Sequence, residues 1–423
     1  MIQTKLYMSA AAFLRRAITG FTFVLSAGAL MGQVTPQGGE HLVVGAIKGD
    51  QVWPCIAFDP AGSGAGLIGW QDSLIDGSGF GIGGALMGSA GSVISQRFQV
   101  NKAGTMSQFY PQAQILGNGR AIYVWNSRIA GTPDVYARLA RPGVNAANFT
   151  TADLRVNTYT KMAQTWPVVT GLADGSAIVV WQSRNQDGSG WGVYARRILA
   201  NGTFATPTEY RVTQVTDFNQ RAPAITTLAN GNFVIVWVSE QERFSGGVDI
   251  YGRLFSPGKG AVTDEVLIND ANMLCDHPAV SALSDGGFTV VWDQVSPNGD
   301  NGKDIWGRTF SSSGYGAGAS FLINTNLLGD QVSPKIASGP TGSLVVWTSI
   351  GQDGDREGVF GRFVANGSQP VGGEQQVNTS YISQQMHPAV AWNGVDRFVV
   401  LWAGFNGTTG FDLFGRNYAL SSQ

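Results

Sequence analysis

Residues 278–292 read PAVSALSDGGFTVVW, two short apolar runs joined by the turn pair Asp285-Gly286. Asp-Gly between apolar runs is a strong β-hairpin signal, because Gly accepts the positive φ of a tight turn. Apolar runs that end in Trp recur seven times along the 423-residue chain, at intervals of 55 or 56 residues. They end at Trp70, Trp125, Trp181, Trp237, Trp292, Trp347 and Trp402. A fixed period of this kind indicates a repeat architecture.

Each repeat unit divides into four short strand-like runs. The first follows a Pro that stands 13 to 16 residues before the Trp, and the second ends at the Trp. The third carries an aromatic-x-Arg pattern such as Tyr194/Arg196, and the fourth a Val-Asn-like pair such as Val156-Asn157. The second run is apolar at consecutive positions, which predicts that both of its faces are covered. Four-stranded sheets stacked face to face satisfy this pattern.

We therefore predict an all-β, seven-bladed β-propeller with four antiparallel strands per blade, spanning residues 39–423. The last unit stops after its third run, while residues 39–44, GEHLVV, match the fourth-run segment 373–378, GEQQVN. The N-terminal strand is thus expected to complete the last blade, and such a closed ring leaves no exposed sheet edge. An open solenoid is the alternative, but it gives no reason for complementary ends.

Residues 1–31 have the features of a secretory signal peptide. Lys5, Arg15 and Arg16 precede an uncharged apolar stretch, and Ala27-Gly28-Ala29 offers a small-residue cleavage site. The stretch is shorter than the roughly 20 residues that a membrane-spanning helix needs. We expect an exported protein that is secreted, periplasmic or on the cell surface, with no integral membrane segment in the mature chain.

The chain has 27 Lys and Arg against 29 Asp and Glu, a formal net charge of −2. This balance lacks the basic surplus that phosphate-backbone binding requires, so we expect no nucleic-acid partner. Of the 29 acidic residues, 19 lie in the connections from a fourth run to the next first run and from a second run to the third. Those connections emerge on one face of a propeller, which predicts an acidic face that attracts cations or basic partners. Ordinary solvated loops are the alternative.

A charge pattern links the third and fourth runs. An acid stands three residues before the fourth-run Val or Ile in five units, where it should face the third-run Arg of the same blade. The expected pairs are Arg138–Asp153, Arg196–Glu209, Arg253–Glu265, Arg362–Glu374 and, through the closing strand, Arg416–Glu40. Two independent solvent-facing positions are the alternative, and exposed ion pairs contribute only about 0–1 kcal/mol.

The residue before each repeat Pro is expected to surround the mouth of the central channel. Five of the seven carry flat rings, and one further Trp lies in a neighbouring loop. These candidate ligand-binding residues are Trp53, Tyr110, Trp166, His277, His387 and, in the loop, Trp191. Aromatic surfaces with a few polar groups commonly hold sugars and other small ligands. The alternative is that the rings only plug the channel.

The connections between second and third runs contain Asp- and Gly-rich strings. Ca²⁺ takes six to eight oxygen ligands, which closely spaced carboxylates and backbone carbonyls can supply. The candidate ligands are Asp187, Asp300, Asp304, Asp353 and Asp355. Lys303 and Arg356 in the same strings would oppose a cation, and none of the strings fits the EF-hand pattern. Tight turns are therefore the alternative to Ca²⁺ sites, and no other cofactor is expected.

The repeat resembles one found in tandem in bacterial secreted and cell-surface proteins, in which a Pro-x-Val run, a run ending in Trp, Gln-Asp-Gly-x-Gly, Val-Tyr-Ala-x-Arg and Val-Asn-Thr follow one another. The third unit is most similar, with QDGSG at residues 186–190 and VYAR at residues 193–196. The first unit departs most, with Ile82-Gly83-Gly84 in place of the aromatic and the Arg. The resemblance implies a bacterial exported repeat protein and transfers no activity or residue role.

Enzyme motifs are scarce, since the chain has only three His and no Gly-x-Ser-x-Gly nucleophile elbow. We expect a monomeric, non-catalytic propeller that binds a glycan or another cell-surface component on the acidic face. A polysaccharide hydrolase or lyase that uses carboxylates of that face is the second hypothesis. A structural repeat protein of the cell envelope is the third.

Overall fold

The computed structural model describes residues 34–420 except 103, 142, 144–147, 242, 297–301, 317, 367–368 and 381. Every regular element in these residues is a β-strand, and no helix there is long and apolar enough to cross a membrane. The expected signal peptide, residues 1–31, lies outside the described residues.

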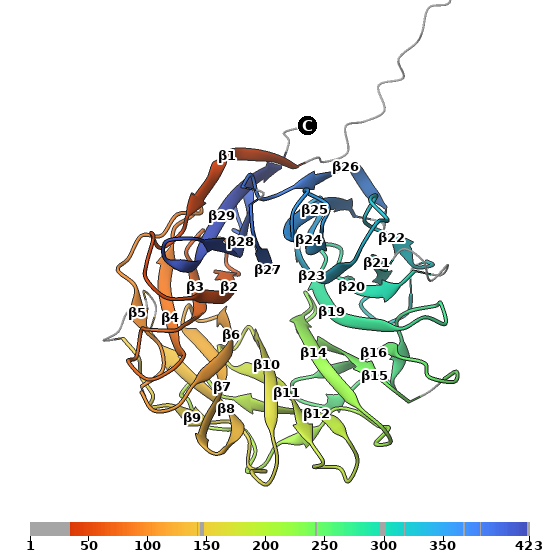
Figure 1. Ribbon diagram of the computed structural model, residues 1–423. Coiled ribbons are helices and arrows are strands. Elements are labelled where there is room, and N and C mark those ends of the chain that lie inside the picture. Colours follow the sequence, from red (N-terminus) through yellow and green to blue (C-terminus); the bar gives the residue numbers. More distant parts are fainter. Residues whose placement is uncertain are drawn as a thin grey trace, which may run out of the picture. The chain divides into compact units, whose positions relative to one another are not determined.

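The strands form seven antiparallel sheets arranged as the blades of a propeller, and the first strand of each sheet lies at the centre of the ring (Figure 1). Blade 1 consists of β2 (Gln51–Phe58), β3 (Gly66–Asp72), β4 (Gly81–Met87) and β5 (Phe98–Gln99). Blade 2 consists of β6 (Gln108–Ile115), β7 (Ala121–Ala130), β8 (Thr132–Ala140) and β9 (Leu154–Arg155). Blade 3 consists of β10 (Gln164–Gly171), β11 (Ala177–Arg184), β12 (Trp191–Ile198) and β13 (Tyr210–Arg211).

In blade 4 the outer strand is divided into two short pieces that both pair with the third strand. Blade 4 consists of β14 (Gln220–Thr227), β15 (Phe233–Ser239), β16 (Asp249–Ser256), β17 (Gly260–Ala261) and β18 (Val266–Leu267). Blade 5 consists of β19 (Cys275–Ala282), β20 (Phe288–Val295), β21 (Lys303–Phe310) and β22 (Phe321–Leu322). Blade 6 consists of β23 (Gln331–Ser338), β24 (Gly342–Ile350), β25 (Glu357–Ala365) and β26 (Pro370–Gln376).

Blade 7 joins the two ends of the ring. It consists of β27 (Gln385–Trp392), β28 (Arg397–Asn406), β29 (Gly410–Leu420) and the N-terminal strand β1 (Val34–Leu42). Leu42 lies opposite Phe414 in the β1–β29 pair, as Gln376 lies opposite Phe360 in blade 6. The predicted all-β, seven-bladed ring is therefore confirmed, and so is its closure by an N-terminal strand in the register of the other blades.

The seven repeat tryptophans form the core between blades. Each is 0 to 1% exposed. Seven hydrophobic clusters occupy the junctions between neighbouring blades, and each contains the Trp of one blade and apolar side chains of the blade before it. Trp181 of blade 3, for example, packs in one cluster with Val135 and Val156 of blade 2. This continuous stacking explains why the second strands are apolar on both faces.

Buried amides tie the blades together where one blade leads into the next. Gln108 Oε1 accepts a hydrogen bond of 3.0 Å from Asn101 of the preceding blade, while its Nε2 donates to the carbonyl of Met106. The same arrangement recurs between Asn324 and Gln331 and between Asn378 and Gln385. A Gln amide suits this position because it both donates and accepts.

Candidate functional site

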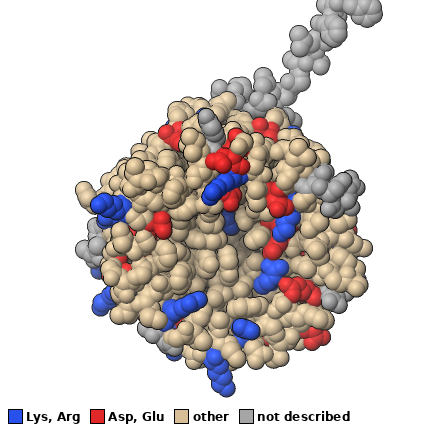
Figure 2. Space-filling view, viewed as in Figure 1, with Lys and Arg blue, Asp and Glu red and all other residues tan. Residues whose placement is uncertain are grey.

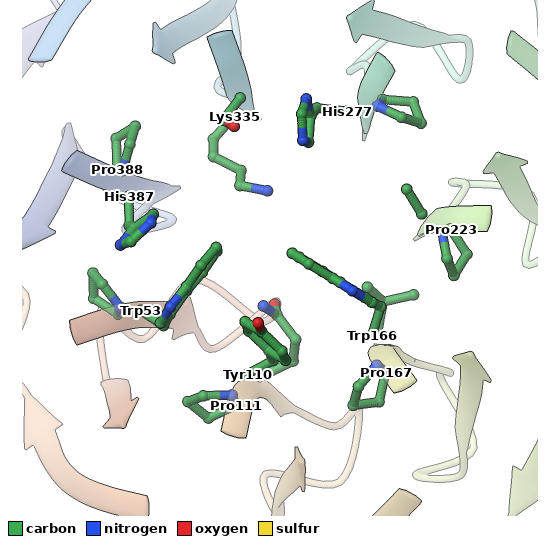
Figure 3. Close-up of a pocket in the computed structure, with 16 residues that line it drawn as sticks. Trp53, Tyr110, Pro111, Trp166, Pro167, Pro223, His277, Lys335, His387 and Pro388 are labelled. Atoms are coloured by element: carbon green, nitrogen blue, oxygen red, sulfur yellow. The ribbon is translucent and has the colours of Figure 1, made fainter. Parts of the chain in front are cut away.

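A β-bulge interrupts the first strand of every blade at the repeat Pro. In blade 1, Val52 lies opposite Gln71 and Cys55 opposite Gly69, so that Trp53 and Pro54 together face a single residue of β3. The residue before the Pro has φ between 47° and 56° in all seven blades, an uncommon value for residues other than Gly. The bulge takes this side chain out of the strand's regular alternation. All seven such residues line one cavity of about 120 Å³ at the centre of the ring (Figure 3).

One side of this cavity, called here the mouth cavity, is formed by four rings in two stacks. Trp53 stacks on His387 with ring centroids 3.7 Å apart, and Tyr110 stacks on Trp166 with centroids 4.4 Å apart. The two stacks meet nearly at right angles, since Trp53 lies at 86° to Tyr110 and at 85° to Trp166. Trp166 remains 36% exposed, so this aromatic wall has a face open to a ligand.

The facing side of the mouth cavity carries charge. His277 Nδ1 lies 2.7 Å from Asp293 Oδ2, and Lys303 Nζ donates to Asp293 Oδ1 at 2.9 Å. The backbone N–H of Ser333 donates to the same carboxylate at 3.0 Å. Burial disfavours the ionised form of Asp293, but the hydrogen bond from His277 and the neighbouring positive charges outweigh it and lower the pKa of the carboxyl. Asp293 is therefore a buried carboxylate next to His277, and it is bonded to His277, Lys303 and the Ser333 backbone.

A second charge cluster supports His277 from blade 4. Arg221 on β14 donates to Asp276 at 2.7 Å and to Glu240 at 3.0 Å. Asp276 Oδ1 also accepts the backbone N–H of His277 at 2.8 Å. These contacts fix the backbone from which the imidazole projects.

Lys335 on β23 is the residue just after a repeat Pro, and its side chain lines the mouth cavity (Figure 3). Its side chain is accessible to solvent within the channel, while protein surrounds it on the channel walls. These surroundings lower the pKa of the ammonium, and the charge of Asp293 opposes that shift. Burial and the neighbouring Lys335 likewise lower the pKa of His387 to about 4, so its ring is neutral near pH 7.

Of the six candidate ligand residues from the sequence, the structure brings five together in the mouth cavity. Trp191 begins β12 and donates its backbone N–H to Asn219, and it is not among the residues that line the cavity. Sequence reasoning missed Lys335 and Asp293, and it considered Lys303 only as a base in a candidate Ca²⁺ string. A signal for Lys335 was present, because it is the only charged residue among the seven that follow a repeat Pro.

In four of five blades, the geometry of the Arg–acid pair differs from the geometry that the sequence predicts. Arg138 and Asp153 approach to 3.9 Å, but among the described residues no ion pair within 4.0 Å joins the other four pairs, namely Arg196–Glu209, Arg253–Glu265, Arg362–Glu374 and Arg416–Glu40. Their carboxylates instead accept backbone N–H groups of the preceding blade, from Thr158, Gln214, Thr325 and Thr379 respectively.

The third-strand arginines also bond to the preceding blade. In six blades the Arg Nη1 donates to the carbonyl of the preceding blade's fourth-run Val or Ile, at 2.6 to 3.0 Å. The arginine and the acid therefore both act across a blade junction. Blade 1 has Ala85 opposite Ile68, the position at which Arg138 lies opposite Tyr123 in blade 2, so it lacks this contact at the junction where the ring closes.

The candidate Ca²⁺ ligands are engaged with local donors. Asp304 accepts the side-chain amide of Asn324 at 2.7 Å, and Asp353 accepts that of Asn378 at 3.1 Å. Asp187 accepts the backbone N–H of Ser189, and Asp355 that of Ser383. No group of three or more His, Cys, Asp or Glu in the described part of the chain is arranged to hold a metal ion. Asp300 lies outside that part, and Ca²⁺ binding stays a prediction.

Solved structures of similar fold are found at very low sequence identity. A protein of unknown function from Dyadobacter fermentans DSM 18053 is 9% identical, with a TM-score of 0.53, over 92% of this chain and 99% of that one. The polysaccharide lyase Uly1 is 10% identical, with a TM-score of 0.53, over 91% of this chain and 100% of that one. The α-L-arabinofuranosidase Arb93A from Fusarium graminearum, in complex with an iminosugar inhibitor, is 11% identical, with a TM-score of 0.50, over 74% and 93%.

These likenesses show the fold alone. No protein-family model matches the chain, and no curated protein matches its sequence. The seven-bladed architecture stands, while the specific bacterial repeat family remains a resemblance carried by the motifs.

Proposed function

We propose that this chain is an exported, non-catalytic propeller that binds one sugar unit of a glycan in the mouth cavity. The observation that carries the proposal is the aromatic wall, two perpendicular ring stacks built from Trp53, Tyr110, Trp166 and His387. Flat rings supply apolar area for the C–H faces of a sugar, and nearby polar groups supply hydrogen bonds to its hydroxyls.

The size of the cavity supports a single sugar unit. One water needs about 10–15 Å³ of cavity volume, and the mouth cavity holds about 120 Å³. The mouth cavity therefore exceeds the space of a single water several-fold, which leaves room for a small ligand.

The placement of the carboxylates favours binding over hydrolysis. A glycoside hydrolase of the common type needs two carboxyl groups beside the scissile bond, yet the described residues that line the mouth cavity include no Asp or Glu. Elsewhere, Asp134, Asp249 and Asp304, near the start of the third strands, each accept an Asn side-chain amide at 2.7 Å. These carboxylates link the third strand of a blade to the segment that follows its fourth strand.

A polysaccharide lyase is the second candidate, and one observation favours it. His277 is oriented by Asp293 through Nδ1, which leaves Nε2 to act as a general base. Two proteins of similar fold are a polysaccharide lyase and an arabinofuranosidase, but their likeness extends only to the fold. The proposal therefore rests on the cavity.

A glycan array probed with the purified protein tests the proposal, with calcium added in one arm and chelated in the other. We expect binding without release of products and loss of binding in the Trp53→Ala/Trp166→Ala variant. Trp191→Ala, which alters an aromatic residue outside the cavity, serves as the matched control and should bind normally. Product release that His277→Ala abolishes would establish the lyase instead, and a silent array in both arms would favour a structural role.

A further inference from the structure

Lys335 introduces the one charged side chain at a position that is small, apolar or neutral in the other blades. The equivalent residues are Cys55, Gln112, Val168, Ala224, Ala279 and Ala389. The Lys335 side chain extends from β23 toward the centre of the channel, across from the aromatic wall (Figure 3). A single repeat thus places a cation where the propeller scaffold does not require one.

The ammonium of Lys335 has no anionic partner among the described residues. Its nearest acid in electrostatic terms is Asp293. That carboxylate already bonds Lys303 at 2.9 Å, His277 at 2.7 Å and the Ser333 N–H at 3.0 Å. The Lys335 ammonium therefore faces the solvent of the channel without a protein counter-charge, so an anion that enters the mouth cavity can form a charge-assisted hydrogen bond with it.

The surroundings of Lys335 select among anions. The aromatic wall of Trp53, Tyr110 and Trp166 lies across the cavity. A small inorganic anion would leave this apolar surface unused, whereas a sugar that carries a carboxylate satisfies both sides at once. On one side it presents C–H faces to the rings, and on the other an oxyanion to the ammonium.

We propose that the sugar bound in the mouth cavity is acidic, a uronate or another sugar carboxylate, and that Lys335 Nζ recognises its carboxylate. This inference rests on the proposed function, because it assigns the ligand class of the same cavity. It gives a role to the cationic group at the centre of the ring, on a face where acidic and basic side chains are interspersed (Figure 2).

Calorimetric titration of the whole protein with single sugars tests the inference. Galacturonate and glucuronate are compared with galactose and glucose, which match them in ring shape and lack the carboxylate. We expect at least one uronate to bind 10-fold or more tightly than its neutral counterpart, with an affinity that falls as salt is raised. Acetate, which supplies the carboxylate without the sugar ring, should not compete.

Variants at Lys335 provide the decisive comparison. Lys335→Met should bring uronate affinity down to that of the neutral sugar and leave neutral-sugar binding unchanged, while Lys335→Arg should retain the preference. Equal binding of uronate and neutral sugar by the unaltered protein, or a preference that survives Lys335→Met, would overturn the inference and leave the proposed function standing. Competition by acetate as strong as that by uronate would also overturn it. Binding of neither sugar would overturn both.

Discussion

The indole of Trp53 stacks on the imidazole of His387 with ring centroids 3.7 Å apart and planes at 19°. Trp53 lies on the first strand of blade 1 and His387 on the first strand of blade 7, the two blades that meet where the ring closes. Half of the aromatic wall therefore lies across the junction between blade 7 and blade 1, where the ring closes. Ring closure and the candidate ligand site are coupled through this contact.

Removal of the closing strand should harm both stability and binding. A chain that begins at Val43 lacks β1 and leaves the edge of β29 without a partner, and bare edges promote association. We expect a lower melting temperature, self-association in sedimentation experiments and loss of sugar binding. A chain that begins at Val34 keeps β1 and is the control. A truncated chain that stays monomeric with an unchanged melting temperature would contradict this role of β1.

The buried and the cavity-lining tryptophans should respond differently to truncation. Trp181 is 0% exposed between blades 2 and 3, so Trp181→Ala should cost about 3–5 kcal/mol of unfolding free energy. Trp166 is 36% exposed, and blade 4 already has Ala222 at the equivalent bulge with φ 49°. Trp166→Ala should thus cost less than about 1 kcal/mol while it weakens sugar binding. Denaturant unfolding of both variants checks this contrast, which equal losses would refute.

The arginines at blade junctions should contribute measurably to stability. Arg196 is 5% exposed and donates to the Val156 carbonyl of blade 2 at 2.7 Å. Arg196→Met leaves that buried acceptor without a donor, at an expected cost of about 1–3 kcal/mol. Arg184→Met, at an exposed position of the neighbouring strand, should change the free energy of unfolding little. A loss at Arg196 no larger than that at Arg184 would mean that the junction contact contributes nothing.

Stability should fall between pH 6.5 and pH 4 because of His387. Its pKa is lowered to about 4 in the folded protein, first by burial and then by Lys335. In this window the His387 imidazole is protonated in the unfolded chain and neutral in the folded chain. The free energy of unfolding therefore rises with pH, and the contribution of His387 is fully present above about pH 6.5. The loss amounts to at most about 3 kcal/mol. Unfolding free energies measured across the window should flatten in His387→Gln, and an unchanged slope in that variant would refute the assignment.

The fold could be predicted from the sequence because its determinants are local and repeated. Trp181 and its six equivalents mark one strand per blade, and the match between residues 39–44 and 373–378 predicted the register in which Leu42 lies opposite Phe414. The ring at the channel mouth was predictable for the same reason, since each of its members stands just before a repeat Pro.

Contacts between blades were harder to predict. Spacing along the chain cannot tell a partner across a hairpin from one in the neighbouring blade, since both lie within reach of a long side chain. Glu209 consequently accepts the backbone N–H of Thr158, and Arg196 donates to the Val156 carbonyl, both in the preceding blade. Lys335 was not predicted because it differs from the equivalent residues of the other six blades, whereas a search for repeats detects the residues that the blades share.

The most direct test of the account is the location of a bound glycan in a crystal of the protein soaked with the tightest ligand from the array. The account predicts one sugar ring against Trp53 and Trp166, with its carboxylate at Lys335 Nζ. A glycan ordered elsewhere, for example in the outer cavity beside Arg197 and Tyr210, with the mouth cavity empty of sugar, would contradict it.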